Sequence, residues 1–383
     1  MKLYEYQGKA LFAKYGIKTP KGIVVNSAAD IATKLPEVSL PVMVKAQVLS
    51  GGRGKAGGVV SASQNAEVAE LAKKMLKSKL GDSKIDALLI EERVDFVEEY
   101  YLSITLDSIS RMPVIIFSAS GGMDIEEIAV QNPEKISKTL VDPLMGLQGF
   151  NFENLFKHSG ITDKAIKDQL KDIVAALYKI YEDYDAMLVE INPLMRLADN
   201  SIVAADAKVE LDDSAVYRHG DLLQWRDTME VDPLEKMARD VRFLYIDVNS
   251  DGNVAVISNG SGMIMSCMDR IAGEGGRVLC ALDLGGGASS ERVAEGIKIM
   301  LQNNKVEMLL ISIFGGITRC DEIAGGIVKA VDEMHISVPI VARLEGTNKE
   351  KGMALLEAAG SRDILIAHDL EDAARKVMLA QKK

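Results

Sequence analysis

The apolar positions in the first half of the chain form short runs, separated by longer stretches with helical periodicity. The periodicity predicts an amphipathic helix that ends at Gly16 and further helices over residues 29–35, 66–80 and 164–184. The runs predict strands at GIVV (22–25), PVMVKAQV (41–48), VVSA (59–62), ALLIEERV (87–94), YYLSITLD (100–107), PVIIFSAS (113–120), MLVEI (187–191) and SIVAADAKVEL (201–211). Short, antiparallel-looking strands with inserted helices indicate an α+β domain.

The second half has a different rhythm. Five apolar runs begin at 253, 278, 307, 338 and 363, and a stretch with helical periodicity follows each of them. Five strand–helix units predict an α/β domain, a parallel sheet with helices on both faces and ligands at the carboxyl ends of the strands. The polar stretch 212–240 reads as a connector, so we expect domains at 1–235 and 236–383.

Composition narrows the function classes. The net charge is −11, which argues against nucleic acid or an anionic membrane as the main partner. No apolar run approaches the roughly 18 residues of a membrane span, and the first residues lack a signal-peptide core. Three scattered cysteines do not form a disulfide framework or a zinc site. We therefore expect a cytoplasmic protein.

The loop AQVLSGGRGKAGG, residues 46–58, has five glycines and the cations Arg53 and Lys55. Clustered backbone N–H groups and cations suit a polyphosphate. A Walker A loop is excluded, because that motif needs glycine at Leu49 and Ser or Thr at Ala56. The loop lies between two predicted strands, which favours a flap that folds over a nucleotide. The alternative is a flexible basic hairpin tip.

Two neighbouring strands carry hard oxygen ligands. With a turn near Asp199, Asn192 and Asp206 lie opposite each other, and Glu190 shares the face of Asn192. An amide and a carboxylate are ligands that Mg²⁺ takes beside nucleotide phosphates, although a solvated polar hairpin would have the same pattern. The acids at 91, 92, 98 and 99 flank another predicted turn. They either accept hydrogen bonds from the base and ribose of a nucleotide or are solvated surface charges.

The predicted parallel sheet has glycine-rich turns at the carboxyl ends of its strands: NGSGM at 259, DLGGGAS at 283 and FGGIT at 314. Such turns bind anions at helix N-termini. Neither Met265 nor Ser290 completes a dinucleotide fingerprint, so NAD is disfavoured. Cys320 opens a helix and reads as a buried thiol rather than a nucleophile. None of the four histidines (158, 219, 335 and 368) belongs to a catalytic or metal constellation.

Five segments together, EYQGKALFAKYGI, KAQVLSGGRGKAGG, EINPL, DLGGGAS and FGGITRCDEIA, resemble the β subunits of succinyl-CoA synthetases, also called succinate–CoA ligases. The resemblance runs along nearly the whole chain. It implies an N-terminal ATP-grasp domain, a C-terminal flavodoxin-like CoA-ligase domain, ATP or ADP as substrate and Mg²⁺. It also implies a partner α subunit that binds CoA and carries a phosphorylated histidine.

The resemblance assigns roles position by position. It implies nucleotide contacts at Lys45, Gly52, Arg53, Gly54, Glu91, Val94 and Glu99. It implies magnesium ligands at Asn192 and Asp206, an acid that steadies the phosphohistidine at Glu190, and contacts to the carboxylate substrate at Asn259, Gly316, Ile317 and Thr318.

Two positions bear on specificity: Pro20 is typical of ADP-forming members, and Thr318 stands where many bacterial members have valine. The segment around Asp82 is shorter than in many bacterial members, and we expect this only to trim a surface loop. A hydroxyl at position 318 raises malate as an alternative acid. Two further alternatives are a self-sufficient ATP-grasp ligase that joins a carboxylate to an amine, and a nucleotide-sensing protein without turnover.

Overall fold

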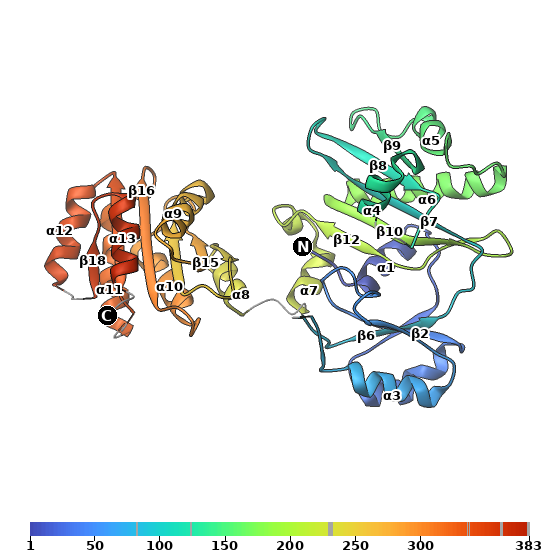
Figure 1. Ribbon diagram of the computed structural model, residues 1–383, viewed down its shortest axis with the longest axis horizontal. Coiled ribbons are helices and arrows are strands. Elements are labelled where there is room, and N and C mark those ends of the chain that lie inside the picture. Colours follow the sequence, from blue (N-terminus) through green and yellow to red (C-terminus); the bar gives the residue numbers. More distant parts are fainter. Residues whose placement is uncertain are drawn as a thin grey trace. The chain divides into compact units, whose positions relative to one another are not determined.

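The computed structural model describes residues 1–81, 83–122, 125–228, 233–334, 336, 338–360 and 363–380. The chain divides into two compact units, residues 1–228 and 229–383 (Figure 1). The segment around Asp82 lies partly outside the described residues. No helix in the described ranges is long and apolar enough to cross a membrane.

The first sheet of the N-terminal unit is fully antiparallel, in the order β1-β6-β2-β3. Its strands are β1 (Gly22–Val25), β2 (Val42–Ala46), β3 (Val59–Ala62) and β6 (Leu88–Glu92). Helices α2 (Ala28–Lys34) and α3 (Asn65–Met75) pack on it around one buried aliphatic core. Because β2 pairs directly with β3, the glycine-rich loop joins adjacent antiparallel strands, as the sequence predicts.

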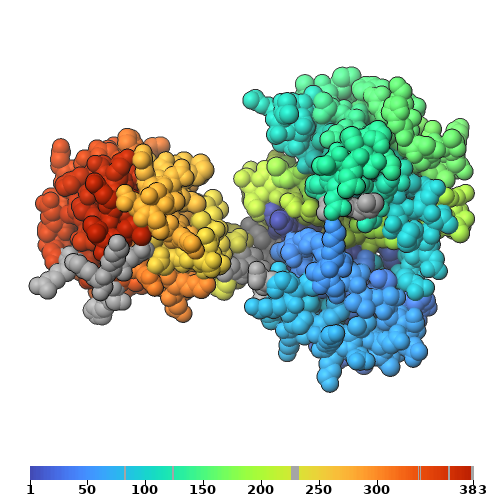
Figure 2. Space-filling model, in the orientation of Figure 1, coloured from blue at the N-terminus to red at the C-terminus, as the bar shows by residue number. Residues whose placement is uncertain are grey.

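The second sheet of this unit is also antiparallel and has the order β11-β10-β7-β8-β9, with β12 paired to β10. Helices α5 (Gly149–Phe156) and α6 (Lys164–Asp183) pack on it, and α1 (Glu5–Lys14) lies against α6 and β12. Figure 2 shows the blue first part of this unit packed against its green second part. The strands are β7 (Glu98–Asp107), β8 (Met112–Ser118), β9 (Ile136–Leu140), β10 (Ala186–Arg196), β11 (Ile202–Ala204) and β12 (Lys208–Leu211).

Three local predictions need correction. The helix expected over 66–80 ends at Met75, since Leu76 is extended and Lys77 has a φ of 63°, and the short strands β4 (Lys79–Leu80) and β5 (Ser83–Lys84) follow. The strand expected over 201–211 is interrupted by residues 205–207, which separate β11 from β12. Strand β9 was missed because its sequence, ISKTL, lacks a long apolar run.

The C-terminal unit contains one sheet in the order β13-β15-β14-β16-β17-β18. The five predicted runs form its parallel strands, whose order 2-1-3-4-5 is that of the flavodoxin fold. They are β14 (Val254–Ser258), β15 (Val278–Asp283), β16 (Met308–Gly315), β17 (Ile340–Gly346) and β18 (Ile364–Ile366). The sequence did not indicate β13 (Leu244–Asp247), an edge strand antiparallel to β15.

Helices cover both faces of this sheet, as the strand–helix rhythm predicts. One face carries α8 (Pro233–Asp240), α10 (Ser290–Leu301), α11 (Cys320–Met334) and α12 (Lys349–Ala359), and the other carries α9 (Ser261–Gly273) and α13 (Leu370–Ala380). Helix α8 packs on β13, so residues 233–235 belong to this unit. The connector between the sheets contains η3 (Val216–Arg218) and α7 (Gly220–Thr228) as well as α8.

Candidate functional site

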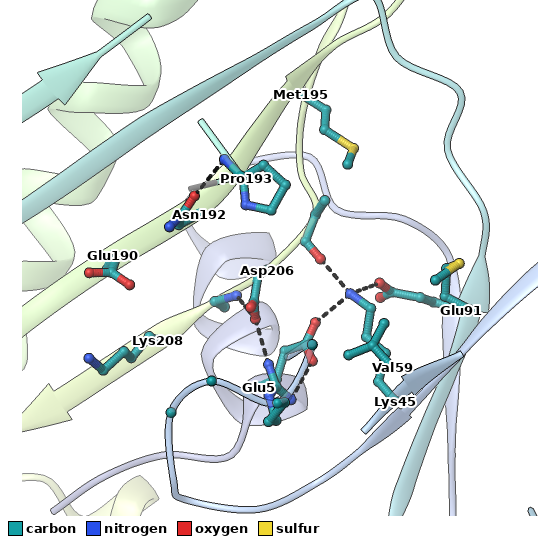
Figure 3. Close-up of a pocket in the computed structure, with 18 of the residues that line it drawn as sticks. Glu5, Lys45, Val59, Glu91, Glu190, Asn192, Pro193, Met195, Asp206 and Lys208 are labelled. Carbon is teal, nitrogen blue, oxygen red and sulfur yellow. Dashed lines mark hydrogen bonds and ion pairs between the residues drawn. The ribbon is translucent and has the colours of Figure 1, made fainter. Parts of the chain in front are cut away.

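A cavity of about 910 Å³ opens inside the N-terminal unit (Figure 3). Its walls come from the start of α1, the β2–β3 loop, the end of β6 and the β10–β12 hairpin region. Nine of the predicted site residues line it: Lys45, Gly52, Arg53, Gly54, Glu91, Val94, Glu190, Asn192 and Asp206. These residues are far apart in sequence, so the fold itself gathers them at one place.

Lys45 reaches this cavity from the buried strand β2. Its ammonium group lies 2.9 Å from Oε1 of Glu5 and 2.7 Å from the Ala205 carbonyl oxygen, and it also pairs with Glu91. Burial alone would lower the pKa of Lys45, but the surrounding carboxylates raise it above its usual range. Lys45 is therefore a permanent cation at the cavity wall.

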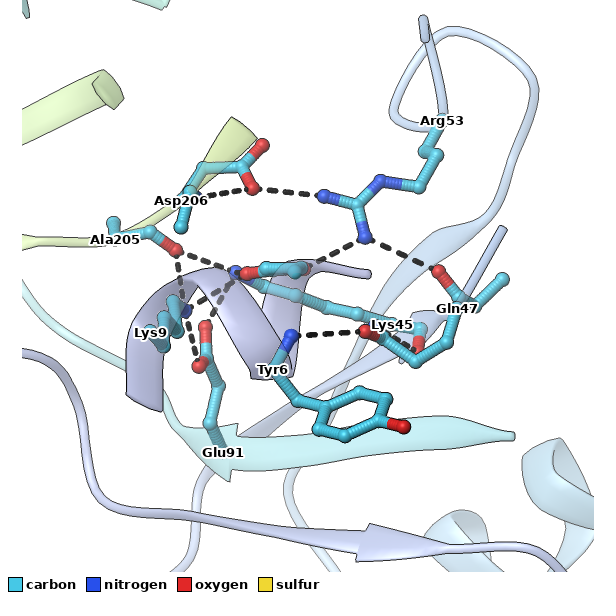
Figure 4. A network of polar contacts seen from close by, with 11 residues as sticks. Tyr6, Lys9, Lys45, Gln47, Arg53, Glu91, Ala205 and Asp206 are labelled. Atoms are coloured by element: carbon cyan, nitrogen blue, oxygen red, sulfur yellow. Dashed lines mark hydrogen bonds and ion pairs between the residues drawn. The ribbon is translucent and has the colours of Figure 1, made fainter. Parts of the chain in front are cut away.

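Arg53 ties the glycine-rich loop to two other segments. Its guanidinium donates to Oε2 of Glu5 at 2.7 Å and to Oδ1 of Asp206 at 2.8 Å (Figure 4). Around it, a Cβ added at Gly51, Gly52 or Gly54 would meet nothing within 4 Å. The Arg53 side chain thus anchors a loop whose glycines face open space.

Glu5 is a site residue that the sequence analysis missed. Its side chain is 1% exposed, and it forms ion pairs with Lys9, Lys45 and Arg53. Burial would raise the pKa of Glu5, but these three cations outweigh burial and hold its pKa far below the usual range. The sequence does hold one signal for Glu5: it stands four residues before Lys9, so the two opposite charges lie on the same side of the amphipathic helix.

The β10–β11 hairpin has the predicted register. Leu194 pairs with Ala204 and Glu190 with Lys208, which places Asn192 opposite Asp206. Oδ1 of Asn192 accepts the Gly122 N–H at 2.9 Å. The two oxygen-bearing side chains therefore lie together at the cavity (Figure 3).

Glu190 lies on β10 two residues before Asn192, and its side chain is half-buried beside Tyr101. The Tyr101 hydroxyl donates to its Oε2 at 2.9 Å, and Lys208 is its register partner on β12. Burial raises the pKa of Glu190, partly offset by the charge of Lys208 and the Tyr101 hydrogen bond. A carboxylate with one oriented oxygen can accept a proton from an incoming donor.

The remaining nucleotide-side predictions differ in placement. Val94 and Pro20 line the cavity. The Glu91 carboxylate is buried against Lys9 and Lys45 rather than standing at a surface strand end. Glu99 does not line the cavity. Its carboxylate lies beside Gly122, which is one of the lining residues.

The predicted carboxylate-substrate residues lie at the carboxyl ends of β14 and β16 in the C-terminal unit. Asn259 bridges these ends, since its Nδ2 donates to the Phe314 carbonyl at 2.8 Å and its Oδ1 accepts the Phe314 N–H at 3.0 Å. Gly316 has open space at its Cα, and Ile317 is 85% exposed. Asp283, also missed from the sequence, accepts the N–H groups of Gly260 and Gly285, each at 2.8 Å.

Thr318 differs from its neighbours because it is buried. Its hydroxyl accepts the Gly287 N–H at 3.0 Å and lies 3.4 Å from the Gly285 carbonyl oxygen. The hydroxyl therefore joins the two glycine-rich turns after β15 and β16. It is already engaged within the protein.

None of the three cysteines and none of the described histidines lines the cavity of the N-terminal unit. Cys320 is buried at the start of α11, and burial raises the pKa of its thiol, as expected for a packing residue. His219 pairs with Asp185, and neither it nor His158 or His368 lines the cavity. His335 lies outside the described residues.

The comparisons with known proteins agree with this architecture. Residues 2–196 match the ATP-grasp domain model and residues 257–378 match the CoA-ligase model. A solved structure of ATP citrate lyase from Methanothrix soehngenii, in complex with citrate and coenzyme A, has a TM-score of 0.79 at 22% identity and covers 100% of this chain and 99% of its own. That likeness shows a shared fold. An ATP-grasp domain followed by a CoA-ligase domain defines a nucleotide-dependent CoA ligase.

Relatives define the family more closely. The chain is 44% identical over 390 residues to the ADP-forming succinate–CoA ligase subunit beta of Myxococcus xanthus, covering 100% of both chains. It is 42% identical over 392 residues to the protein of the same name from a Nitratiruptor species, covering 100% of this chain and 99% of that one. The chain belongs to the family of ADP-forming succinate–CoA ligase β subunits.

Proposed function

We propose that this chain is the nucleotide-binding subunit of a ligase that interconverts succinyl-CoA, ADP and phosphate with succinate, CoA and ATP. The observation that carries the proposal is one cavity in which Lys45 and Arg53 face the Asn192–Asp206 hairpin, within a chain similar to these β subunits along its full length. Cations for phosphates and oxygen ligands for a metal are the parts that nucleotide chemistry needs. The test is ATP-dependent formation of succinyl-CoA by this chain together with its partner subunit.

Magnesium fits the residues present at the hairpin. Asn192 supplies an amide oxygen and Asp206 a carboxylate, both of which are hard ligands. Arg53 donates to Oδ1 of Asp206, so a cation already occupies one side of this carboxylate. When bound, Mg²⁺ would neutralise charge on the nucleotide phosphates. The chain's own part is to hold the two oxygens in register.

Replacing Asp206 by asparagine should weaken use of magnesium nucleotide by about tenfold or more, because a hard-cation site loses its negative charge. Nucleotide titrations at fixed and varied Mg²⁺ measure this effect. Asp199→Asn, in the turn of the same hairpin, is the matched control. An unchanged Mg²⁺ dependence in the Asp206 variant would remove this residue from the metal site.

The glycine-rich turns of the C-terminal unit support a carboxylate site built from Asn259, Gly316, Ile317 and Thr318. Backbone N–H groups at strand-to-helix turns bind anions without a charged side chain. Since the Thr318 hydroxyl already accepts the Gly287 N–H, it gives no specific support to malate over succinate. Succinate is therefore the acid that we propose.

Replacing Thr318 by valine should impair both acids alike. The change leaves the Gly287 N–H without its acceptor, at a cost of about 1–3 kcal/mol, and loosens the turn that holds the acid. We expect KM for succinate and for malate to rise together by several-fold, while KM for ATP stays nearly fixed. Steady-state kinetics with both acids measure this. A change in their ratio would mean that the hydroxyl contacts the acid directly.

We also propose that the partner subunit carries the histidine that is phosphorylated during turnover. The relatives' name, subunit beta, supports a partner. The placement of the three described histidines away from the cavity supports a phosphoryl carrier from another chain. A histidine is a suitable covalent carrier between two sites.

All three cysteines are free and buried, which supports the expected reducing, cytoplasmic setting.

A further inference from the structure

Two buried lysines share the same set of acceptors at the cavity wall (Figure 4). Nζ of Lys9 lies 2.8 Å from Oε1 of Glu5, 2.5 Å from Oε2 of Glu91 and 2.8 Å from the Ala205 carbonyl oxygen. Nζ of Lys45 pairs with Oε1 of Glu5, Oε1 of Glu91 and the same carbonyl oxygen. Lys9 thus has the same three partner residues as Lys45 in this network, with one oxygen of Glu91 for each lysine.

This arrangement leaves Lys45 without a spare proton. An ammonium group has three N–H donors, and Lys45 directs them to three acceptors within the protein. To contact a nucleotide phosphate, Lys45 has to give up at least one of these. The side chains of Glu5 and Glu91 are only 1% and 2% exposed, so water cannot replace a lost partner cheaply.

We propose that Lys9 is a positioning residue of the nucleotide site: it keeps Glu5, Glu91 and the Ala205 carbonyl paired when Lys45 turns to a phosphate. The inference rests on the proposed function, in which Lys45 meets the nucleotide. Lys9 acts through Lys45, because Lys9 is not among the residues that line the cavity.

The charges of the network support this role. Lys9, Lys45 and Arg53 balance Glu5, Glu91 and Asp206, three against three. Arg53 cannot replace Lys9, since within this set it pairs only with Oε2 of Glu5 and with Asp206. Without Lys9 this set keeps two cations against three carboxylates, and Lys45 becomes the only cation of the set paired with Glu91. Both changes oppose the approach of a phosphate to Lys45.

The test is the variant Lys9→Met in the full chain, assembled with its partner subunit. We expect KM for ATP to rise by about tenfold or more. Without Lys9, the buried Glu91 carboxylate has no cation of this set beside it whenever the Lys45 ammonium turns to a phosphate. KM for succinate and for CoA should stay within about twofold, as the acid site is in the other unit. Lys14→Met, on the same helix but bonded to Tyr184 and Asp221, is the matched control and should leave all three constants unchanged.

A purely structural role of Lys9 predicts a different pattern: less assembled complex and lower kcat, with an unchanged KM for ATP. That result overturns the proposal. If Lys9→Met does not assemble, Glu5→Gln is compared with Glu5→Gln/Lys9→Met, which differ only at Lys9. A higher KM for ATP in the double variant supports the role, and equal values overturn it. Failure of the proposed function is distinct, because then the wild-type complex itself makes no succinyl-CoA from ATP, CoA and succinate.

Discussion

The isolated chain should bind ATP·Mg²⁺ but form no succinyl-CoA from ATP, CoA and succinate. The nucleotide cavity and the glycine-rich turns of the proposed acid site belong to different units, and no described histidine lines the cavity. Under the proposed function, a histidine of the partner subunit carries the phosphoryl group between them. Adding the partner subunit should raise turnover from background to a normal enzymatic rate, on the order of 1–10³ s⁻¹.

Calorimetric ATP titration and a coupled assay of succinyl-CoA measure the two halves of this prediction. Circular dichroism checks that the isolated chain is folded, and a folded chain that does not bind ATP would contradict the first half of the prediction. Turnover by the isolated chain with an amine in place of CoA would favour the self-sufficient ATP-grasp ligase. ATP binding without turnover in the assembled complex would favour a nucleotide sensor.

Replacing Glu190 by glutamine should reduce kcat of the assembled complex by about 10²- to 10⁴-fold, the range typical of a positioned general base. The Tyr101 hydroxyl orients one oxygen of this carboxylate, so the other is left to accept an N–H from an incoming imidazole. Glutamine keeps the shape but removes the negative charge. The dissociation constant for ATP should change little, because Lys45 and Arg53 are untouched.

Rapid-quench phosphorylation of the complex separates this effect from substrate binding. Glu67→Gln, which changes a carboxylate of α3 that accepts the Ser63 N–H, is the matched control and should keep full activity. Tyr101→Phe should lie between the two, since the charge remains but loses its orientation. A Glu190→Gln variant with near wild-type phosphorylation would remove Glu190 from the phosphoryl transfer.

Local patterns predicted the parts of the structure that depend on sequence neighbours. The five strand–helix units follow from apolar runs at regular spacing, and they form the parallel strands of the flavodoxin-like sheet. The loop between β2 and β3 follows from glycines between two apolar runs. The opposition of Asn192 and Asp206 follows from the two-residue period of a hairpin with a turn near Asp199.

Contacts between distant segments escaped the sequence analysis. Glu5 and Lys9 look like the polar side of an amphipathic helix, yet they are buried because Lys45, Glu91 and Arg53 supply opposite charges from strands and a loop elsewhere. Nothing local marks such a network, since each charge is ordinary by itself. Asp283 was read only as the start of a glycine-rich turn. Its role in holding two turns together requires Gly260 from another strand end.

The most direct test of the account follows the phosphoryl group itself. The chain is incubated with γ-labelled ATP and Mg²⁺, alone and with the partner subunit, and the subunits are then separated. We expect no label on this chain alone, and a label on the partner that is lost in acid and kept in base, as for phosphohistidine. Label on His158, His219, His335 or His368 of this chain, in the absence of the partner, would contradict the two-subunit mechanism.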